Sequence, residues 1–177
     1  MPRELFNKAK FRALLHYICY RADVAKLGST KLNKILWYAD SLSYIHRGHS
    51  LTGEMYQKDR HGPIPHHYLP IMAELERCGD VVKGNSEYHG YNKTDYHCST
   101  SPDMSCLEKD EIELVDALIG IICEKHTAVS ISELTHDRIW ELADVGEEIP
   151  YCATLAAVIE KPSEAARNWA FSVSSED

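Results

Sequence analysis

The segment THDRIWELADVGEEI, from Thr135 to Ile149, combines residue types that could carry chemistry. His136 stands four residues before Trp140, and an acidic turn follows. A histidine can serve as a catalytic base, a metal ligand or a hydrogen-bonded structural group, and a tryptophan can anchor a partner protein. Each role needs further groups, which can be sought in the rest of the chain.

A zinc site needs four nitrogen or sulfur ligands, usually in closely spaced pairs. The nearest candidates are His89, His97, Cys98 and Cys106. The one close pair is His97–Cys98, and adjacent residues of a strand point to opposite faces. A second group is more typical of surface and core-edge positions; it comprises His61, His66 and His67. We therefore expect no metal and no cofactor.

Nucleophilic catalysis needs a thiol or hydroxyl beside a base. His136–Asp137 supplies half of such a set, but no cysteine or serine stands in a nucleophile elbow. The stretch HGPIPHH lacks the glycines and lysine of a phosphate loop. The six cysteines form no CxxC pair, so we expect no disulfide framework and mostly small buried side chains. The sequence thus favours a protein that is not an enzyme.

Length and composition favour one soluble domain. The chain has 177 residues, of which 44% are apolar, enough for a single core. No apolar run approaches the roughly 20 residues of a membrane span, and the N-terminus lacks the apolar stretch of a signal peptide. We expect a cytoplasmic protein with no membrane partner.

The net charge of −8 is unevenly distributed. Residues 1–70 hold eleven Lys and Arg against five Asp and Glu, whereas residues 71–177 hold eight against twenty-two. This asymmetry indicates a basic N-terminal face and an acidic C-terminal half. Two interpretations stay open: a polarised solvated surface, or a face that meets a charged partner. The acidic total argues against general nucleic-acid affinity.

Apolar periodicity predicts helices over residues 5–21, 30–48 and 107–125. In the second of these, the apolar face leaves Lys31 and Lys34 on the other side and Asp40 outward. A further helix is predicted from Pro65 to about Cys78, with a kink or a delayed start at Pro70. The first two helices resemble a helix-turn-helix in outline, so a DNA-binding regulator is the alternative function.

The remaining segments predict short elements. We expect a small strand near residues 54–58, a break of any element at residues 61–63, and two strands, VVK and YNKTDYHCS, within residues 80–104. Ser130 and Glu133 form a capping-box pattern, which predicts a short helix, a turn and a second short helix through Trp140. A last helix is predicted from Pro162 to about Ala170. The fold class is α+β, mainly helical: a compact single domain over residues 1–171 with a small antiparallel sheet or hairpin, then a disordered tail over 172–177.

Three segments, in order, resemble the SocA-like Panacea antitoxin domain family. KLNKILWYADSLSYIHRGHSLTGEMY is similar to its helix followed by an LTG-x-x-Y signature, HGPIP to its Gly-Pro turn, and ISELTHDRIWELADVGEEI to its C-terminal His…Trp…Ile block. The resemblance covers about Leu5 to Ile149. His61 departs from the pattern, because an aromatic residue, commonly tyrosine, tends to precede the Gly-Pro. The chain also shows no added DNA-binding domain of the kind that some relatives carry.

The resemblance implies a mainly helical domain with a small sheet that acts by binding. Members of this family are encoded beside toxin genes in bacteria and phages, and they neutralise unrelated toxins by direct contact. The expected function is therefore that of an antitoxin with a cognate toxin protein as partner; DNA is not an expected partner, and the sequence leaves a homo-oligomer open. The candidate toxin-binding or family-signature residues are Trp37, Tyr38, Asp40, Tyr56, His61, Gly62, Pro63, His136 and Trp140.

The physical chemistry of these residues agrees with a binding role. An acidic C-terminal half can cover a basic toxin surface, and the aromatic residues Trp37, Tyr38, Tyr56 and Trp140 can anchor such a surface if exposed, although burial is the commoner fate of each. We expect His136 and Trp140 to pack on the second helix and the Gly62–Pro63 region. His136 would be a hydrogen-bonded buttress; the exposed polar side would comprise Asp137, Arg138 and Glu141.

Overall fold

The structure, a computed structural model, describes residues 4–88 and 90–155. In chain order its elements are α1 (Lys8–Arg21), α2 (Gly28–Arg47), β1 (Tyr56–Asp59), β2 (Gly62–Pro65), α3 (Tyr68–Cys78), β3 (Val81–Tyr88), β4 (Tyr91–Cys98), α4 (Lys109–Lys125), α5 (Ala128–Glu133), α6 (Arg138–Leu142) and β5 (Glu148–Ile149). The expected α+β, mainly helical class is confirmed. The predicted helix from Pro162 and the tail over 172–177 lie outside the described residues.

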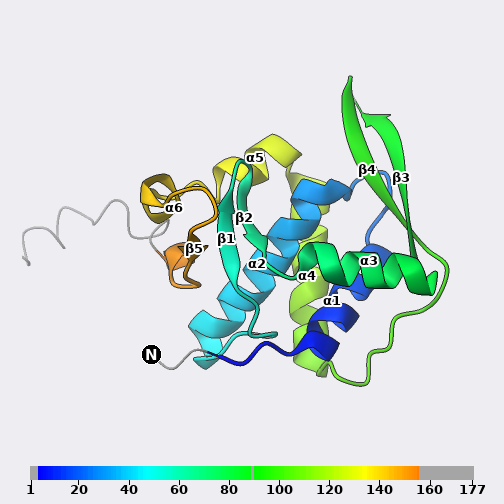
Figure 1. Cartoon of the computed structure of the whole chain (residues 1–177), viewed down its shortest axis with the longest axis horizontal. Helices are drawn as coiled ribbons and strands as arrows, with labels where there is room; N and C mark the ends of the chain where they lie inside the picture. The colour runs from blue at the N-terminus through cyan, green and yellow to red at the C-terminus, as the bar shows by residue number, and fades with distance from the viewer. Residues whose placement is uncertain (1–3, 89, 156–177) are drawn as a thin grey trace, which may run out of the picture.

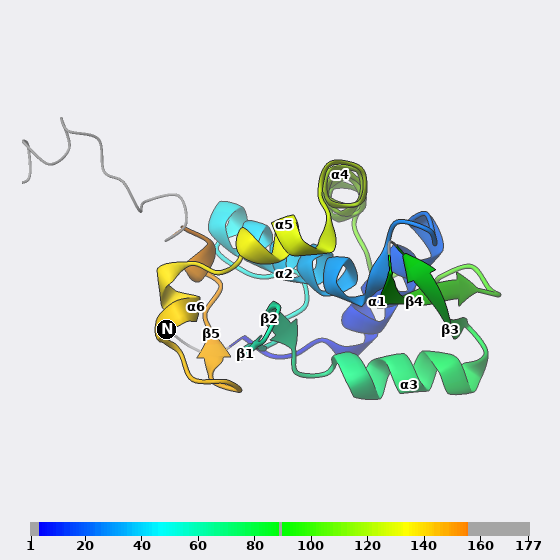
Figure 2. The same cartoon turned by 90° about the horizontal axis from the view of Figure 1, so that it is seen from above.

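Helix α2 is the centre of the fold. It packs against α1, α4, α5, β2 and β4, and Figures 1 and 2 show these elements around it. Because it is enclosed on several sides, its polar residues are buried along with its apolar ones. The expectation that Lys31, Lys34 and Asp40 face outward is therefore wrong: their exposed fractions are 8%, 1% and 0%.

The three-stranded sheet has the order β2-β1-β5, with both pairings antiparallel. The expectation that residues 61–63 break any element is wrong, because Gly62–Pro65 forms β2, paired from Asp59↔Gly62 to Tyr56↔Pro65. Proline has no backbone N–H and is confined to edge strands. Pro63 and Pro65 are two residues apart, so both lack the N–H on the same side of β2, which can then face away from β1.

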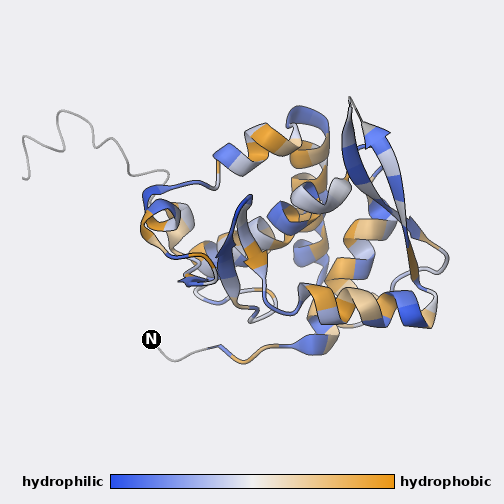
Figure 3. Ribbon diagram, turned by 45° about the horizontal axis from the view of Figure 1, so that its top comes forward, coloured by the Kyte–Doolittle hydropathy of each residue, from blue (hydrophilic) through white to orange (hydrophobic). Residues whose placement is uncertain are grey.

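The second sheet is the β3–β4 hairpin, paired from Val81↔Cys98 to Tyr88↔Tyr91. The two expected strands are confirmed, and the first runs five residues beyond VVK. Val81 and Tyr96 are buried near the base. The rest of the hairpin projects from the helices in Figure 1, and Figure 3 shows mostly polar residues along it.

Local capping decides where the helices begin. The side chain of Asn7 accepts a hydrogen bond from Lys10 N (3.1 Å), so α1 begins at Lys8 and Leu5, expected in its apolar stripe, lies outside the helix with 93% exposure. Helix α3 shows the delayed start expected at Pro70, which falls in its first turn. The capping box of α5 is formed by Thr127 and Ser130 rather than by Ser130 and Glu133, because α5 begins at Ala128.

Ion pairs join basic residues of the N-terminal half of the chain to acidic residues of the C-terminal half. Basic residues of α1, α2 and the turn between them face the acidic residues of α4. These pairs are Lys10–Glu111 (2.6 Å), Arg47–Asp110 (2.7 Å), Lys26–Glu124 (2.6 Å) and Arg21–Asp116 (3.4 Å). The expectation of separate basic and acidic faces therefore fails at α4, because its carboxylates are matched within the domain.

The cysteines are less buried than expected. All six are free; Cys19 and Cys123 are buried, Cys98 and Cys106 are half-buried, and Cys78 and Cys152 are exposed. The expectation that most of the cysteines are buried is therefore wrong, because only two of the six are. Over residues 4–88 and 90–155, no helix combines the length and the apolar character that a bilayer crossing requires.

Candidate functional site

The carboxylate of Asp40 organises the signature segment LTGEMY. It accepts three hydrogen bonds, from Thr52 N (2.7 Å), Thr52 Oγ1 (2.8 Å) and Tyr56 Oη (2.7 Å). Burial raises the pKa of Asp40 to about 7, although these three donors act in the opposite direction. Asp40 thus fixes the loop after α2 to the start of β1 from inside the core. We call these three residues the Asp40 cluster.

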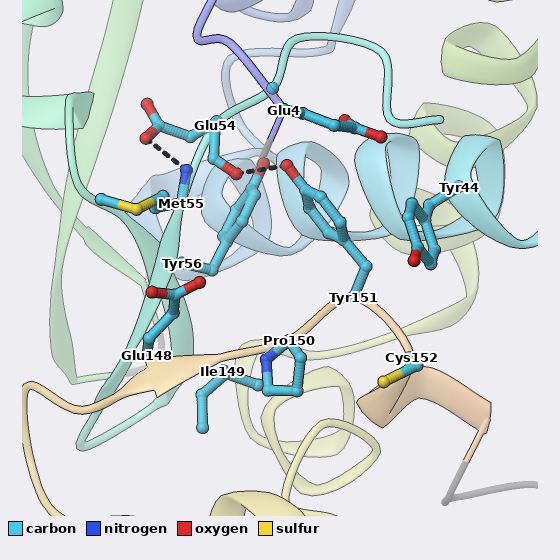
Figure 4. A pocket seen from close by; sticks show the side chains of 11 residues that line it. Glu4, Tyr44, Glu54, Met55, Tyr56, Glu148, Ile149, Pro150, Tyr151 and Cys152 are labelled. Carbon is cyan, nitrogen blue, oxygen red and sulfur yellow. Dashed lines mark hydrogen bonds between the residues drawn. The ribbon is translucent and has the colours of Figure 1, made fainter. Parts of the chain in front are cut away.

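Aromatic rings enclose this cluster. Trp37 and Tyr56 meet edge to face at 5.0 Å, and Tyr151 lies 6.0 Å from Tyr56 and donates a hydrogen bond to the carbonyl oxygen of Glu54. Figure 4 shows Tyr151 beside Tyr56 at the wall of a pocket, with Tyr44 further along α2. Trp37 and Tyr56 are at most 2% exposed, so neither presents a surface for a partner in this conformation.

Glu54, which the sequence analysis did not single out, belongs to the same region. Its buried carboxylate accepts hydrogen bonds from Met55 N (2.7 Å) and His67 N (3.2 Å) and lies 2.9 Å from His67 Nδ1. Phe6 stacks on His67 at 4.0 Å. An acidic residue between glycine and methionine gives no local signal of burial, because its partner His67 lies thirteen residues further along the chain, after β2.

A second buried group surrounds Lys34. Its Nζ donates a hydrogen bond to the carbonyl oxygen of Pro63 (3.1 Å). Gly62 lies so close that a Cβ on it would overlap both the Lys34 amine and the hydroxyl of Thr135. Burial lowers the pKa of Lys34 to about 7. This Lys34 cluster, comprising Lys34, Gly62, Pro63 and Thr135, joins α2 to β2 and to the turn after α5.

His136 and Trp140 form one stack, with ring centroids 3.7 Å apart and planes 6° from parallel. Ser132 links the stack to β2, because its Oγ donates to the carbonyl oxygen of His61 (2.8 Å) and lies 3.3 Å from His136 Nε2. Trp140 lies under Lys58 Nζ of β1, at 4.3 Å. The structure thus places His136 against the turn before Gly62, and Trp140 against β1.

The polar residues around this stack differ in part from expectation. Arg138 and Glu141 are exposed as expected. Asp137 is only 7% exposed, and its side chain caps α6 by accepting a hydrogen bond from Trp140 N (2.9 Å). The expectation that Asp137 is exposed is therefore wrong, because its carboxylate faces the first turn of α6 as the N-cap. Burial lowers the pKa of His136, and Lys34 and His61 act in the same direction, which favours the neutral imidazole.

The candidate residues therefore fall into two buried clusters and one stack, with few of them on the surface. Asp40 and Tyr56 are buried in the Asp40 cluster, with Trp37 buried beside them, and Gly62 and Pro63 are buried in the Lys34 cluster. Tyr38, His136 and Trp140 are half-buried, and His61 is exposed. Among residues 4–88 and 90–155, no group of three His, Cys, Asp or Glu side chains is arranged to hold a metal ion.

Replacing Lys34 with methionine should remove a pH dependence of stability. In the unfolded chain a lysine is protonated up to a pKa of about 10.5, but in the fold Lys34 loses its proton near pH 7. Unfolding between pH 7 and 10.5 therefore takes up a proton, so stability rises with pH across that window. Urea unfolding should show the wild type gaining about 2 kcal/mol relative to Lys34→Met between pH 7 and 9. Parallel curves for the two proteins would mean that Lys34 stays charged.

Replacing His136 with alanine should destabilise the fold by about 1–2 kcal/mol, because the ring loses its stack on Trp140 and its contact with Ser132. The matched control is His136→Phe, which keeps the stack and loses only the polar contact. Denaturant midpoints measure both. If His136→Ala kept the wild-type midpoint but no longer neutralised a toxin, His136 would contact the toxin rather than stabilise the fold.

These contacts define a mainly helical domain in which the polar residues of the Asp40 cluster are hydrogen-bonded to one another in the core. A family model described as the SocA-like antitoxin, Panacea domain, matches residues 32–141. The match runs from α2 to α6, includes both clusters and the stack, and covers more than half of the chain. The chain belongs to this SocA-like Panacea domain family. No curated protein and no solved structure is significantly similar to it.

Proposed function

We propose that this protein is the antitoxin of a bacterial or phage toxin–antitoxin system, and that it neutralises a cognate toxin protein by direct binding in the cytoplasm, without catalysis. The observation that carries the proposal is the family match over residues 32–141. The SocA-like antitoxins that define the family give the general role. The partner and the binding mode are our own inference.

The arrangement of the matched residues supports a binding scaffold. The polar groups of the Asp40 cluster are hydrogen-bonded to one another inside the core. A catalytic group instead has to reach a substrate. The buried signature residues therefore support the shape of the domain, and we expect the toxin to meet side chains on its surface.

The positions of Lys31 and Lys34 count against the DNA-binding alternative. It depends on Lys31 and Lys34 meeting phosphates, but both are buried at the start of α2. Lys31 Nζ donates to the carbonyl oxygen of Cys123 (3.2 Å), and Lys34 Nζ donates to Pro63. In this arrangement neither amine is placed to meet a phosphate, which supports a protein-binding role over the DNA-binding alternative.

A growth assay tests the proposal. The reading frame adjacent to this gene is expressed alone, with this protein, and with a frameshifted copy of this gene as the control. We expect growth arrest in the first and third cultures, relief in the second, and co-purification of the two proteins. A harmless neighbouring product, or arrest that persists with the intact protein, would refute the proposal.

A further inference from the structure

The segment from α6 to β5 exposes two large apolar side chains that are three residues apart in the sequence. Leu142 is 77% exposed and Val145 is 79% exposed. Single apolar residues on a surface are ordinary, so exposure alone assigns nothing to them. This segment differs from an ordinary exposed loop because several hydrogen bonds fix its backbone while both side chains stay exposed.

Lys58 of β1 holds the segment through its backbone and its side chain together. Lys58 N donates to the carbonyl oxygen of Glu147 (2.8 Å), and Gly146 N donates to the carbonyl oxygen of Lys58 (2.9 Å). Its Nζ donates to the carbonyl oxygens of Ala143 (2.9 Å) and Glu141 (3.3 Å). One residue thus fixes both ends of the turn that carries Leu142 and Val145.

The turn also has an internal hydrogen-bond pair. Asp144 N donates to the carboxylate of Glu147 (2.7 Å), and Glu147 N donates back to the carbonyl oxygen of Asp144 (2.9 Å). A segment that is already ordered loses little conformational entropy when it binds. Leu142 and Val145 are therefore presented in advance, as anchors of an interface would be.

Charge selects the class of partner. Four exposed acidic residues flank the two apolar residues in the sequence; they are Glu141, Asp144, Glu147 and Glu148. Of the cations on β1 and α6, Lys58 is directed at backbone carbonyls and the Trp140 ring, and Arg138 is exposed at the start of α6. A second copy of this chain would bring the same negative rim, and a nucleic acid would bring phosphates, so like charges disfavour both. A basic protein surface with an apolar depression would be complementary to this segment in both charge and polarity.

We propose that residues 141–148 form the toxin-docking segment, in which Leu142 and Val145 enter an apolar depression on the toxin and the carboxylates meet Lys and Arg residues at its rim. This inference rests on the proposed function. The family match ends at residue 141, where the docking segment begins, so residues 142–148 lie outside the matched range. A common scaffold can in this way present a segment of its own to each toxin.

The test compares two double variants of the full chain. Leu142→Asp/Val145→Asp alters the docking segment, and Leu69→Asp/Val82→Asp is the matched control on α3 and β3, where the two residues are 72% and 53% exposed. Figures 1 and 2 place α3 and β3 at the opposite end of the molecule from α6 and β5. The probe is the purified product of the adjacent reading frame, titrated by calorimetry. We expect the docking variant to bind about 100-fold more weakly and the control to bind within about 3-fold of the wild type.

Thermal melting followed by circular dichroism separates docking from folding. Unchanged melting with lost affinity supports the docking segment. If the aspartates lower the melting temperature, Leu142→Ser/Val145→Ser replaces them, and the same loss of affinity is required. Wild-type affinity in a folded docking variant would overturn this inference and leave the antitoxin function standing. A wild-type protein that does not bind the probe would refute the proposed function itself.

Discussion

Replacing Asp40 with alanine is expected to destabilise the protein by about 3–5 kcal/mol. The substitution removes the acceptor of three buried hydrogen bonds, from Thr52 N, Thr52 Oγ1 and Tyr56 Oη. A buried donor without a partner costs about 1–3 kcal/mol, and the Asp40 side chain is fully buried, so water cannot replace the lost carboxylate. The loss should appear as a lower midpoint in urea unfolding followed by circular dichroism.

Two milder variants serve as controls for this prediction. Asp40→Asn keeps the shape, and its amide can donate to the hydroxyls of Thr52 and Tyr56, which accept as well as donate; we expect a loss of about 1–2 kcal/mol. Tyr56→Phe removes one donor and leaves Asp40 with both bonds from Thr52, so a loss of about 1 kcal/mol follows. If Asp40→Ala were no worse than Tyr56→Phe, the carboxylate would not organise the signature segment.

The sequence predicted the helices well because each depends on a local pattern. Apolar spacing gave α2 and α4 within two residues at each end, and Gly48 marked the end of α2 as a left-handed residue with φ +79°. The β3–β4 pair was also local, since its strands are joined directly. These elements are decided by residues within a few turns of each other in the chain.

The same reasoning failed for the buried polar residues of α2. Asp40 and Lys34 were predicted to face outward because neither belongs to the apolar face of the helix. Their partners lie far along the chain: Tyr56 is sixteen residues beyond Asp40, and Pro63 is twenty-nine beyond Lys34. The spacing of residues within one helix cannot predict a contact with a residue so far along the chain. The family signature contained these residues, but only the fold explains why they stand together.

The docking segment escaped prediction for a different reason. The sequence analysis took Trp37 and Tyr56 as candidate anchors because aromatic residues dominate interfaces, whereas Leu142 and Val145 carry no such compositional signal. Their backbone is held by Lys58, some eighty residues earlier, which donates hydrogen bonds to the carbonyl oxygens of Glu141 and Ala143. A presented surface of this kind becomes visible only when the positions of both segments are known.

Replacing Gly62 with alanine is expected to cost about 3–5 kcal/mol, because two effects combine. The backbone of Gly62 has φ +96°, a conformation that residues with a Cβ rarely adopt, and the new methyl group would overlap Lys34 Nζ and Thr135 Oγ1 in a buried site. The matched control is Gly48→Ala, where φ is +79° and nothing lies within 4 Å of a Cβ. That variant bears only the conformational strain, about 1–2 kcal/mol.

The difference between the two glycine variants measures the close approach of β2 to α2 and α5. Equal losses in urea unfolding would show that the Lys34 cluster relaxes freely around a methyl group. A double-mutant cycle with Thr135→Ala locates the overlap: removing the hydroxyl should recover at least about 1 kcal/mol of the Gly62→Ala loss. Because β2 pairs with β1, and β1 carries Lys58, displacement of the hairpin should also disturb residues 141–148. We therefore expect Gly62→Ala to weaken toxin binding under conditions in which it remains folded, and Gly48→Ala to leave that binding unchanged.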